Sequence, residues 1–164
     1  MRPEILTLDR IATPLGAVLV VTDGADAVCA FDFEDYEPRM RRLLARHHPK
    51  AMLVDGPAPE AVKAAVAAYF AGDVHALDGL KVRTGGTDFQ REVWAALRAI
   101  PPGETRSYGQ LAVAVGRPKA MRAVGLANGS NPIGVIVPCH RVIGANGTLT
   151  GYAGGVERKR WLLE

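Results

Sequence analysis

The first third of the chain alternates short apolar stretches with turn residues. Apolar and polar positions alternate over residues 5–11, and strand-length apolar stretches follow at 17–21 and 27–33. Pro14-Leu15-Gly16 separates the first two stretches, and Asp23-Gly24 separates the second from the third. Period-two alternation and short apolar runs between turn residues are typical of strands joined by tight turns. We therefore predict an antiparallel meander for this part of the chain.

Two helices are predicted to follow the meander. One begins near Pro38, and the other begins near Pro59 and ends at Gly72. Proline in the first turn and glycine after the last turn are preferred at helix ends. Each helix has apolar residues at helical spacing on one face: Met40, Leu43 and Leu44 in the first, and Val62, Val66 and Tyr69 in the second.

Gly85-Gly86 interrupts this pattern, and we place a domain boundary there, between residues 1–84 and 85–164. Directly after it, Thr87 and Gln90 have the spacing of a capping box, which opens a helix. Pro101-Pro102-Gly103 ends that helix, whose apolar residues recur at helical spacing: Phe89, Val93, Trp94, Leu97 and Ile100.

Two further helices are predicted close together in the second half. Ser107 can cap a short helix over residues 108–115, which stops at Gly116, and Pro118 begins another that runs to about Asn128. Two helices joined by a short turn that contains glycine form the helix-turn-helix pattern. Most such pairs are only packed helices, so the pattern alone leaves DNA binding open.

The second of these helices is rich in small residues. Ala120, Ala123 and Ala127 share one face, while Arg122 and Gly125 lie three apart on a neighbouring face. Small side chains let a helix backbone approach a partner closely, and that partner is either another helix or a nucleic acid. A long arginine among glycine and alanines favours a surface pressed against DNA, with Arg122 as the probe.

The composition is that of a soluble globular protein, with 164 residues of which 48% are apolar and 23% charged. The longest apolar stretches are strand-sized, so we expect no transmembrane helix, no membrane partner and no secretory signal. Two cysteines exclude a disulfide scaffold and favour a reducing, cytoplasmic setting. The four histidines lack zinc-finger spacing, and we predict no metal.

The net charge of +3 hides an uneven distribution. Residues 1–84 carry 10 Lys and Arg against 12 Asp and Glu, a balance of −2. Residues 85–164 carry 10 against 5, a balance of +5. This excess is either an ordinary solvated basic surface or a surface that meets a polyanion, most simply nucleic acid.

A candidate reactive centre follows the helix pair. The apolar residues 135–137 are predicted to form a buried strand that leads into Pro138-Cys139-His140-Arg141. A thiolate is a strong nucleophile, and an imidazole within reach, directly or through water, can accept the thiol proton. Cys29 lies within the third predicted strand instead, where we expect a buried structural thiol.

Four segments of the second half occur together in the order of a known family: Arg122-Ala123-Val124-Gly125, Asn131-Pro132, Pro138-Cys139-His140-Arg141-Val142-Ile143 and Gly151-Tyr152-Ala153-Gly154-Gly155. In this combination the chain resembles the O6-alkylguanine-DNA alkyltransferases, also called methylated-DNA–protein-cysteine methyltransferases. The first half fits the family more loosely, through Ala12-Thr13-Pro14-Leu15-Gly16 and Tyr69-Phe70-Ala71-Gly72.

The resemblance implies a role for each matching residue. Cys139 would attack the alkyl carbon on guanine and keep the group as a stable thioether, and His140 would relay the thiol proton through a water. Tyr108 would donate a hydrogen bond to a guanine ring nitrogen, so that the base leaves as neutral guanine. Asn131 would be the hinge between the recognition helix and the active-site loop, and Arg122 would fill the gap left by the flipped nucleotide.

The resemblance also implies a substrate pocket and a mode of DNA binding. The carbonyls of Cys139 and Val142 would read the guanine amino group, and Tyr152 and the amide of Ala153 would line the pocket. The family inserts its helix into the minor groove of double-stranded DNA carrying O6-alkylguanine, with the damaged base flipped out of the stack. The implied protein is a monomer that needs no cofactor.

One residue of the family pattern has no counterpart in the chain. In the family a Cys–water–His–Glu relay polarises the nucleophile, and its glutamate follows the cysteine by about 27 residues, which falls about two positions beyond Glu164. Three explanations stay open. The sequence is trimmed, Glu164 or its terminal carboxylate takes the place of the glutamate, or activation of the nucleophile is weaker.

We therefore predict an α/β protein with a small N-terminal antiparallel sheet and helices, followed by a mainly helical C-terminal domain that contains a helix-turn-helix. Its predicted function is direct DNA repair by irreversible, single-turnover alkyl transfer to Cys139. One alternative is a non-enzymatic protein that flips the base without repairing it, and Cys139 disfavours it because such proteins replace the cysteine. The other is a transcription regulator, disfavoured because the Ala/Gly-rich helix lacks the Asn, Gln and Arg array that reads the major groove.

Overall fold

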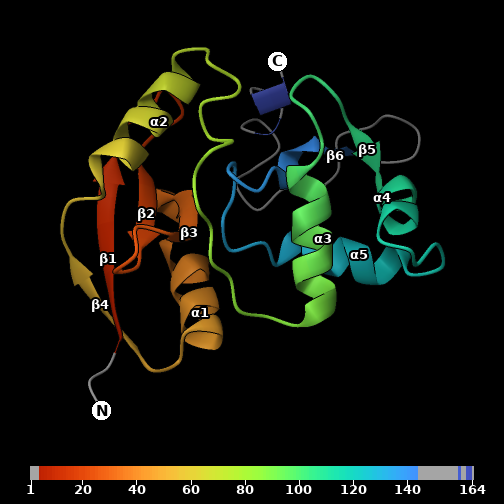
Figure 1. Cartoon of the computed structure of the whole chain (residues 1–164), viewed down its shortest axis with the longest axis horizontal. Coiled ribbons are helices and arrows are strands. Elements are labelled where there is room, and N and C mark those ends of the chain that lie inside the picture. Colours follow the sequence, from red (N-terminus) through yellow and green to blue (C-terminus); the bar gives the residue numbers. More distant parts are fainter. Residues whose placement is uncertain (1–3, 144–158, 160–161, 164) are drawn as a thin grey trace. The chain divides into compact units, whose positions relative to one another are not determined.

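The structure is a computed structural model and describes residues 4–143, 159 and 162–163 of the chain. The chain divides into two compact units, Met1–Gly85 and Gly86–Glu164. Figure 1 shows the helices and strands of both units. None of the described helices is long and apolar enough to cross a membrane.

The first unit is built on a four-stranded sheet in the order β3-β2-β1-β4. Strands β1 (Glu4–Ile11), β2 (Val18–Thr22) and β3 (Val28–Phe33) pair antiparallel, which confirms the predicted meander. Strand β4 (Ala51–Asp55) was not predicted, and it pairs parallel with β1. The sheet is therefore mixed rather than wholly antiparallel, because a helical crossover after β3 lets a later strand run in the direction of β1.

Two helices lie at the positions predicted for them. Helix α1 (Glu37–His47) has Pro38 in its first turn, and α2 (Glu60–Phe70) follows directly after Pro59. Every residue of β2 and β3 is buried, although β3 is an edge strand of the sheet. Helix α1 packs on the sheet through Met40 and Leu44, which belong to one buried cluster with Leu6, Leu8, Leu19, Val21, Cys29 and Ala30.

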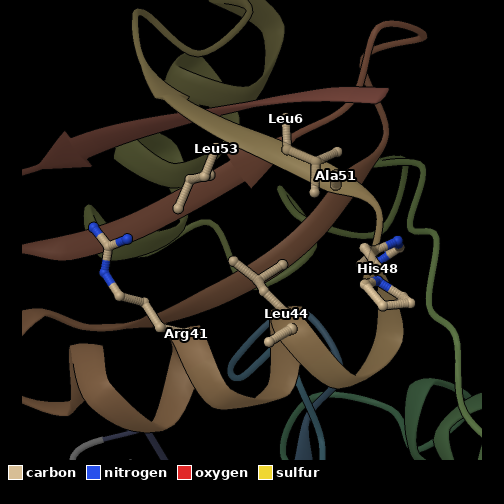
Figure 2. Close-up of a pocket in the computed structure, with 8 residues that line it drawn as sticks. Leu6, Arg41, Leu44, His48, Ala51 and Leu53 are labelled. Carbon is tan, nitrogen blue, oxygen red and sulfur yellow. The ribbon is translucent and has the colours of Figure 1, made fainter. Parts of the chain in front are cut away.

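A small cavity of about 200 Å³ lies between α1 and the strands β1 and β4. Figure 2 shows apolar walls that include Leu6, Leu44 and Leu53, with Arg41 and His48 at opposite ends. The Arg41 side chain is paired with Glu37 of the same helix, with its Nε 2.7 Å from the carboxylate. None of the predicted site residues lines this cavity.

The second unit is mainly helical. Its helices are α3 (Asp88–Arg98), α4 (Tyr108–Ala114) and α5 (Met121–Gly129). Two short strands, β5 (Arg106–Ser107) and β6 (Val142–Ile143), pair in parallel, and the 3-10 helix η2 (Cys139–Arg141) precedes β6. Trp94 of α3 is buried and donates from Nε1 to the carbonyl of Ala127 over 2.8 Å, which joins α3 to α5.

Two of these helices begin at capping boxes. Thr87 Oγ1 accepts the N–H of Gln90 over 3.1 Å, and the Gln90 side chain accepts the N–H of Thr87 over 3.0 Å. Ser107 and Gln110 make the same reciprocal pair at the start of α4, over 3.1 and 2.9 Å. Both helix starts were predicted, since the interacting residues are only three apart.

Helix α5 begins three residues later than predicted. Gly116, at a φ of 75°, follows α4, and the N–H of Arg117 donates to the carbonyl of Ala112 over 2.9 Å in the manner of a glycine C-cap. The N–H of Ala120 then donates to the carbonyl of Arg117 over 2.9 Å. Pro118 is therefore the second residue of a β-turn, a position that proline favours, and not the first residue of the helix.

Candidate functional site

Cys139 is the first residue of η2 and follows Pro138. The residue is 6% exposed, and its N–H donates to the carbonyl of Val137 over 2.8 Å. Arg141, at the end of η2, donates from Nη1 to the carbonyl of Ile100 over 2.7 Å. The cysteine therefore sits on a turn that is tied to the segment following α3.

The segment before Cys139 is a buried turn, and the strand predicted at 135–137 is wrong. Val137 N–H donates to the carbonyl of Ile133 over 2.9 Å, which closes the turn. Val135 has a φ of 66°, a left-handed conformation that costs a β-branched residue about 1–3 kcal/mol. The apolar run suggested a strand because three consecutive apolar residues have no periodicity that distinguishes a buried strand from a buried turn.

Asn131 holds this turn in place. It is 1% exposed, its Nδ2 donates to the carbonyl of Val137 over 2.7 Å, and its Oδ1 accepts the N–H of Ile133 over 2.9 Å. Asn131 comes two residues after the end of α5 and directly after its C-cap, Ser130. One buried side chain therefore connects the end of α5 to the turn that presents Cys139, and its role as a hinge stays a prediction.

His140 is fully buried next to the cysteine. Burial lowers the pKa of its imidazole to about 3, and the positive charges of Arg141 and Lys159 act in the same direction. The ring is therefore neutral at pH 7 and can accept a thiol proton, although its surroundings make it a weak base. The thiolate that forms when the proton moves would itself stabilise the imidazolium through their opposite charges.

The protein should lose stability through His140 as the pH falls below about 6.5. The pKa of His140 is lower in the folded protein than in the unfolded chain, so only the unfolded chain binds this proton between the two values. The contribution of His140 to the free energy of unfolding is complete above the pKa that the residue has in the unfolded chain. It declines by at most about 1.4 kcal/mol per pH unit as the pH falls toward the pKa in the folded protein. Urea denaturation between about pH 7 and pH 4.5 should therefore show that the stability of His140→Gln depends less on pH than the stability of the wild type. Parallel pH profiles for the two proteins would contradict the assignment.

Lys159 is a candidate site residue that the sequence did not reveal. It is fully buried, and its Nζ donates to the carbonyl of Val142 over 2.6 Å. Burial lowers the pKa of Lys159, while the interaction with Cys139 acts to raise it. The lysine stands between Arg158 and Arg160, and a basic run of this kind is typical of an exposed face. Its burial and its electrostatic interaction with Cys139 mark it as a basic group close to the thiol.

Replacing Lys159 with methionine should move the alkylation of Cys139 by iodoacetamide to higher pH. The thiolate is the reactive form, and removing a nearby positive charge destabilises it. We expect the midpoint of the rate–pH profile to rise by about one pH unit. Lys159→Arg keeps the charge and should shift the midpoint less, and Lys119→Met removes an exposed charge and should not shift it. A lower rate at every pH with an unchanged midpoint would indicate a purely structural role.

The predicted DNA-facing residues are distributed unevenly around α5. Arg122 and Ala123 are exposed, and Ala120 is the half-buried residue just before the helix. Ala127 is 3% exposed, because the helical repeat places it on the inner side together with Val124. The structure therefore removes Ala127 from the DNA-facing set, and the role of the others stays a prediction.

Tyr108 begins α4 and is half-buried beside α5. A β-carbon built on Gly125 would lie 3.8 Å from Cδ1 of the Tyr108 ring, so the glycine backbone lies against the aromatic ring. This contact couples the first residue of α4 to the middle of the helix that carries Arg122.

Of the other predicted pocket residues, the structure describes only Val142. Val142 is fully buried, and its carbonyl, which was predicted to read guanine, already accepts the Lys159 hydrogen bond and keeps its second lone pair. Tyr152 and Ala153 lie outside the described residues. Within the described residues, no group of three His, Cys, Asp or Glu could hold a metal ion, and the absence of a metal stays a prediction.

Comparison with known proteins gives consistent matches. The family model described as "6-O-methylguanine DNA methyltransferase, DNA binding domain" matches residues 88–164. A methylated-DNA–protein-cysteine methyltransferase of Salmonella typhimurium is 55% identical over 157 residues, which cover 94% of this chain and 92% of that protein. One of Mycobacterium tuberculosis is 64% identical over 97 residues, covering 59% of this chain and 58% of that protein.

Solved structures extend the likeness to the three-dimensional fold. The crystal structures of Mycobacterium tuberculosis O6-methylguanine methyltransferase and of Mycobacterium tuberculosis OGT in complex with DNA match with TM-scores of 0.78 and 0.79. Each is 42% identical and covers 96% of this chain and 90% of its own. The similarity therefore includes both units.

Proposed function

The chain belongs to the family of methylated-DNA–protein-cysteine methyltransferases, which are transferases, and on this basis we propose that it repairs O6-alkylguanine in DNA by irreversible alkyl transfer to Cys139. The observation that carries the proposal is the placement of Cys139. It is buried on a turn held by Asn131, next to the neutral imidazole of His140 and in electrostatic interaction with the buried amine of Lys159.

The proposed reaction is a displacement at the alkyl carbon. The Cys139 proton passes to His140, through a water in the family mechanism, and the thiolate sulfur forms a bond to the alkyl carbon as the carbon–O6 bond breaks. The electrons of that bond stay on guanine, which takes up one proton at a ring nitrogen where the Tyr108 hydroxyl donates a hydrogen bond. His140 releases the thiol proton to solvent, so one proton is taken up for each one released. The products are neutral guanine and a thioether on Cys139.

Substrate recognition is proposed to combine a flipped base with contacts to the duplex. The carbonyls of Cys139 and Val142 would accept hydrogen bonds from the guanine amino group, and Tyr152 and the amide of Ala153 would line the pocket. The exposed side of α5 would enter the minor groove, where Arg122 occupies the space of the extruded nucleotide. The related Mycobacterium tuberculosis OGT has a crystal structure in complex with DNA. Residues 85–164 of this chain carry the charge balance of +5 that DNA binding favours.

Turnover number tests this proposal directly. A thioether offers no leaving group that water or another thiol can displace, so the protein cannot regenerate Cys139. No cofactor takes part in the proposed step. When methylated duplex is titrated onto the protein, product should level off at no more than one equivalent, and unmodified duplex should give none. The plateau should not depend on salt, while the rate below saturation should fall as salt rises, since phosphate contacts release counterions.

Two results would defeat parts of the proposal. Product above one equivalent would show true turnover and exclude a self-inactivating mechanism. A rate that does not change with salt, under conditions limited by binding, would exclude a role for the basic surface of residues 85–164. We further propose that the protein acts as a monomer in the cytoplasm, which sedimentation and fractionation can test.

A further inference from the structure

Leu126 is a large apolar side chain at the centre of the exposed side of α5. It is 71% exposed, whereas Val124, Ala127 and Asn128 of the same helix are buried. Leu126 follows Arg122 by four residues, so the two side chains lie on the same side of the helix, one turn apart. The exposed side of the helix therefore presents the cationic Arg122 and the apolar Leu126 next to each other, and Met121 at the start of the helix is 52% exposed as well.

The charge around this side of the helix indicates what covers it. Residues 115–130, which include α5 and the connection before it, contain no Asp or Glu. The same segment contains three basic residues, Arg117, Lys119 and Arg122, all of which are exposed. Arg117 is paired with Glu92 of α3, with 3.5 Å between its Nη2 and the carboxylate. An apolar side chain beside Lys119 and Arg122 on a segment without acidic residues fits a partner with a negatively charged rim and an apolar floor. The minor groove of DNA, with phosphates along its edges and sugars and base edges between them, has that character.

The spacing along the helix agrees with that partner. Four residues of α-helix rise about 6 Å, which is close to two base steps of about 3.4 Å each. If Arg122 occupies the site of the flipped nucleotide, Leu126 reaches the base pairs next to it and not the damaged base. Apolar side chains such as leucine are used by other minor-groove proteins as wedges against base steps.

We propose that Leu126 is a second probe of the minor groove, which packs against the sugars and base edges beside the flipped nucleotide and strengthens binding to duplex DNA. This inference rests on the proposed function and adds a contact residue that acts on the duplex and not on the reaction at Cys139. The contact is apolar, so it should strengthen binding without releasing counterions from the phosphates.

The test compares Leu126→Ala with the wild type in binding to a fluorescein-labelled duplex that contains O6-methylguanine, at two salt concentrations. We expect the variant to bind about tenfold more weakly at both concentrations, with an unchanged dependence on salt. Leu126→Met, which keeps a long apolar side chain, should bind like the wild type. Arg122→Ala, which removes a charge, should both weaken binding and reduce the dependence on salt.

Two controls separate DNA binding from folding and from the reactive site. Alkylation of Cys139 by iodoacetamide should proceed at the wild-type rate in Leu126→Ala. Val74→Ala removes an apolar side chain that is 49% exposed in the first unit, and it should leave DNA binding unchanged.

Each other result overturns the inference in a distinct way. Wild-type binding by Leu126→Ala would show that Leu126 does not contact the duplex. A changed salt dependence, or slower alkylation of Cys139 by iodoacetamide, would mean that the substitution acts through charge or through misfolding. If the wild type repairs methylated DNA and Leu126→Ala binds equally well, only this inference fails; if the wild type does not repair it, the proposed function fails.

Discussion

Replacing Cys139 with alanine should abolish alkyl transfer from methylated DNA, whereas Cys29→Ala should leave transfer at the wild-type level. Cys139 lies beside His140 and within the field of Lys159, two groups that can take its proton and stabilise its thiolate. Cys29 lies in β3, 1% exposed, and burial raises the pKa of its thiol despite the opposing effect of Arg83. The Cys29 thiol therefore stays protonated and inert at neutral pH.

Intact-protein mass spectrometry after mixing with methylated duplex measures this prediction. The wild type and Cys29→Ala should each gain one alkyl group, and Cys139→Ala should gain none. Thermal unfolding of both variants is the control, since each substitution is expected to cost at most about 1 kcal/mol of stability. Peptide mapping that located the alkyl group on Cys29 would refute the assignment of the nucleophile.

Asn131→Ala should lower both the stability of the second unit and the rate of transfer, the latter at least about tenfold. The substitution removes both bonds of the Asn131 side chain and leaves the Ile133 N–H and the Val137 carbonyl without these partners. The Ile133 N–H then lacks the partner that Asn131 supplied, and a buried donor without a partner costs about 1–3 kcal/mol, while the Val137 carbonyl keeps the N–H of Cys139. Because the Cys139 N–H donates to the same Val137 carbonyl, a shift of the turn also moves the nucleophile.

Urea denaturation and single-turnover transfer from methylated duplex measure the two effects of Asn131→Ala. The neighbouring variant Ser130→Ala is the matched control, since it removes only the hydrogen bond from Ser130 Oγ to the Leu126 carbonyl at the end of α5. It should change stability by less than about 1 kcal/mol and leave the transfer rate unchanged. Normal stability and a normal rate in Asn131→Ala would show that the turn does not depend on this side chain.

Features that depend on residues close together in the sequence were predictable. The capping boxes at Thr87 and Ser107 involve partners three residues away, so the helix starts were identified correctly. The meander of β1, β2 and β3 followed from alternation and turn residues, since antiparallel neighbours are joined by short turns. The candidate nucleophile was identified because Pro138-Cys139-His140-Arg141 is contiguous and occurs with other family segments.

Features that depend on distant residues were decided only by tertiary structure. Strand β4 has a short apolar run with Met52 and Val54 exposed, and its parallel partner β1 lies more than forty residues earlier. The residues 135–137 are buried in a turn because Asn131 satisfies backbone groups that a strand would pair with a neighbour. Composition alone could not distinguish these outcomes.

The sequence by itself therefore determined the class of fold, most helix and strand positions and the identity of the candidate nucleophile. Tertiary structure decided which side of α5 is exposed, placing Ala127 inside and Leu126 outside, and it placed Lys159 in the interior beside Cys139. The physical reason is that local hydrogen bonding acts over a few residues and can be inferred from spacing. Burial of a particular side chain depends instead on which distant elements pack against it. The electrostatic field at the Cys139 thiol likewise depends on which charged groups those elements bring close to it.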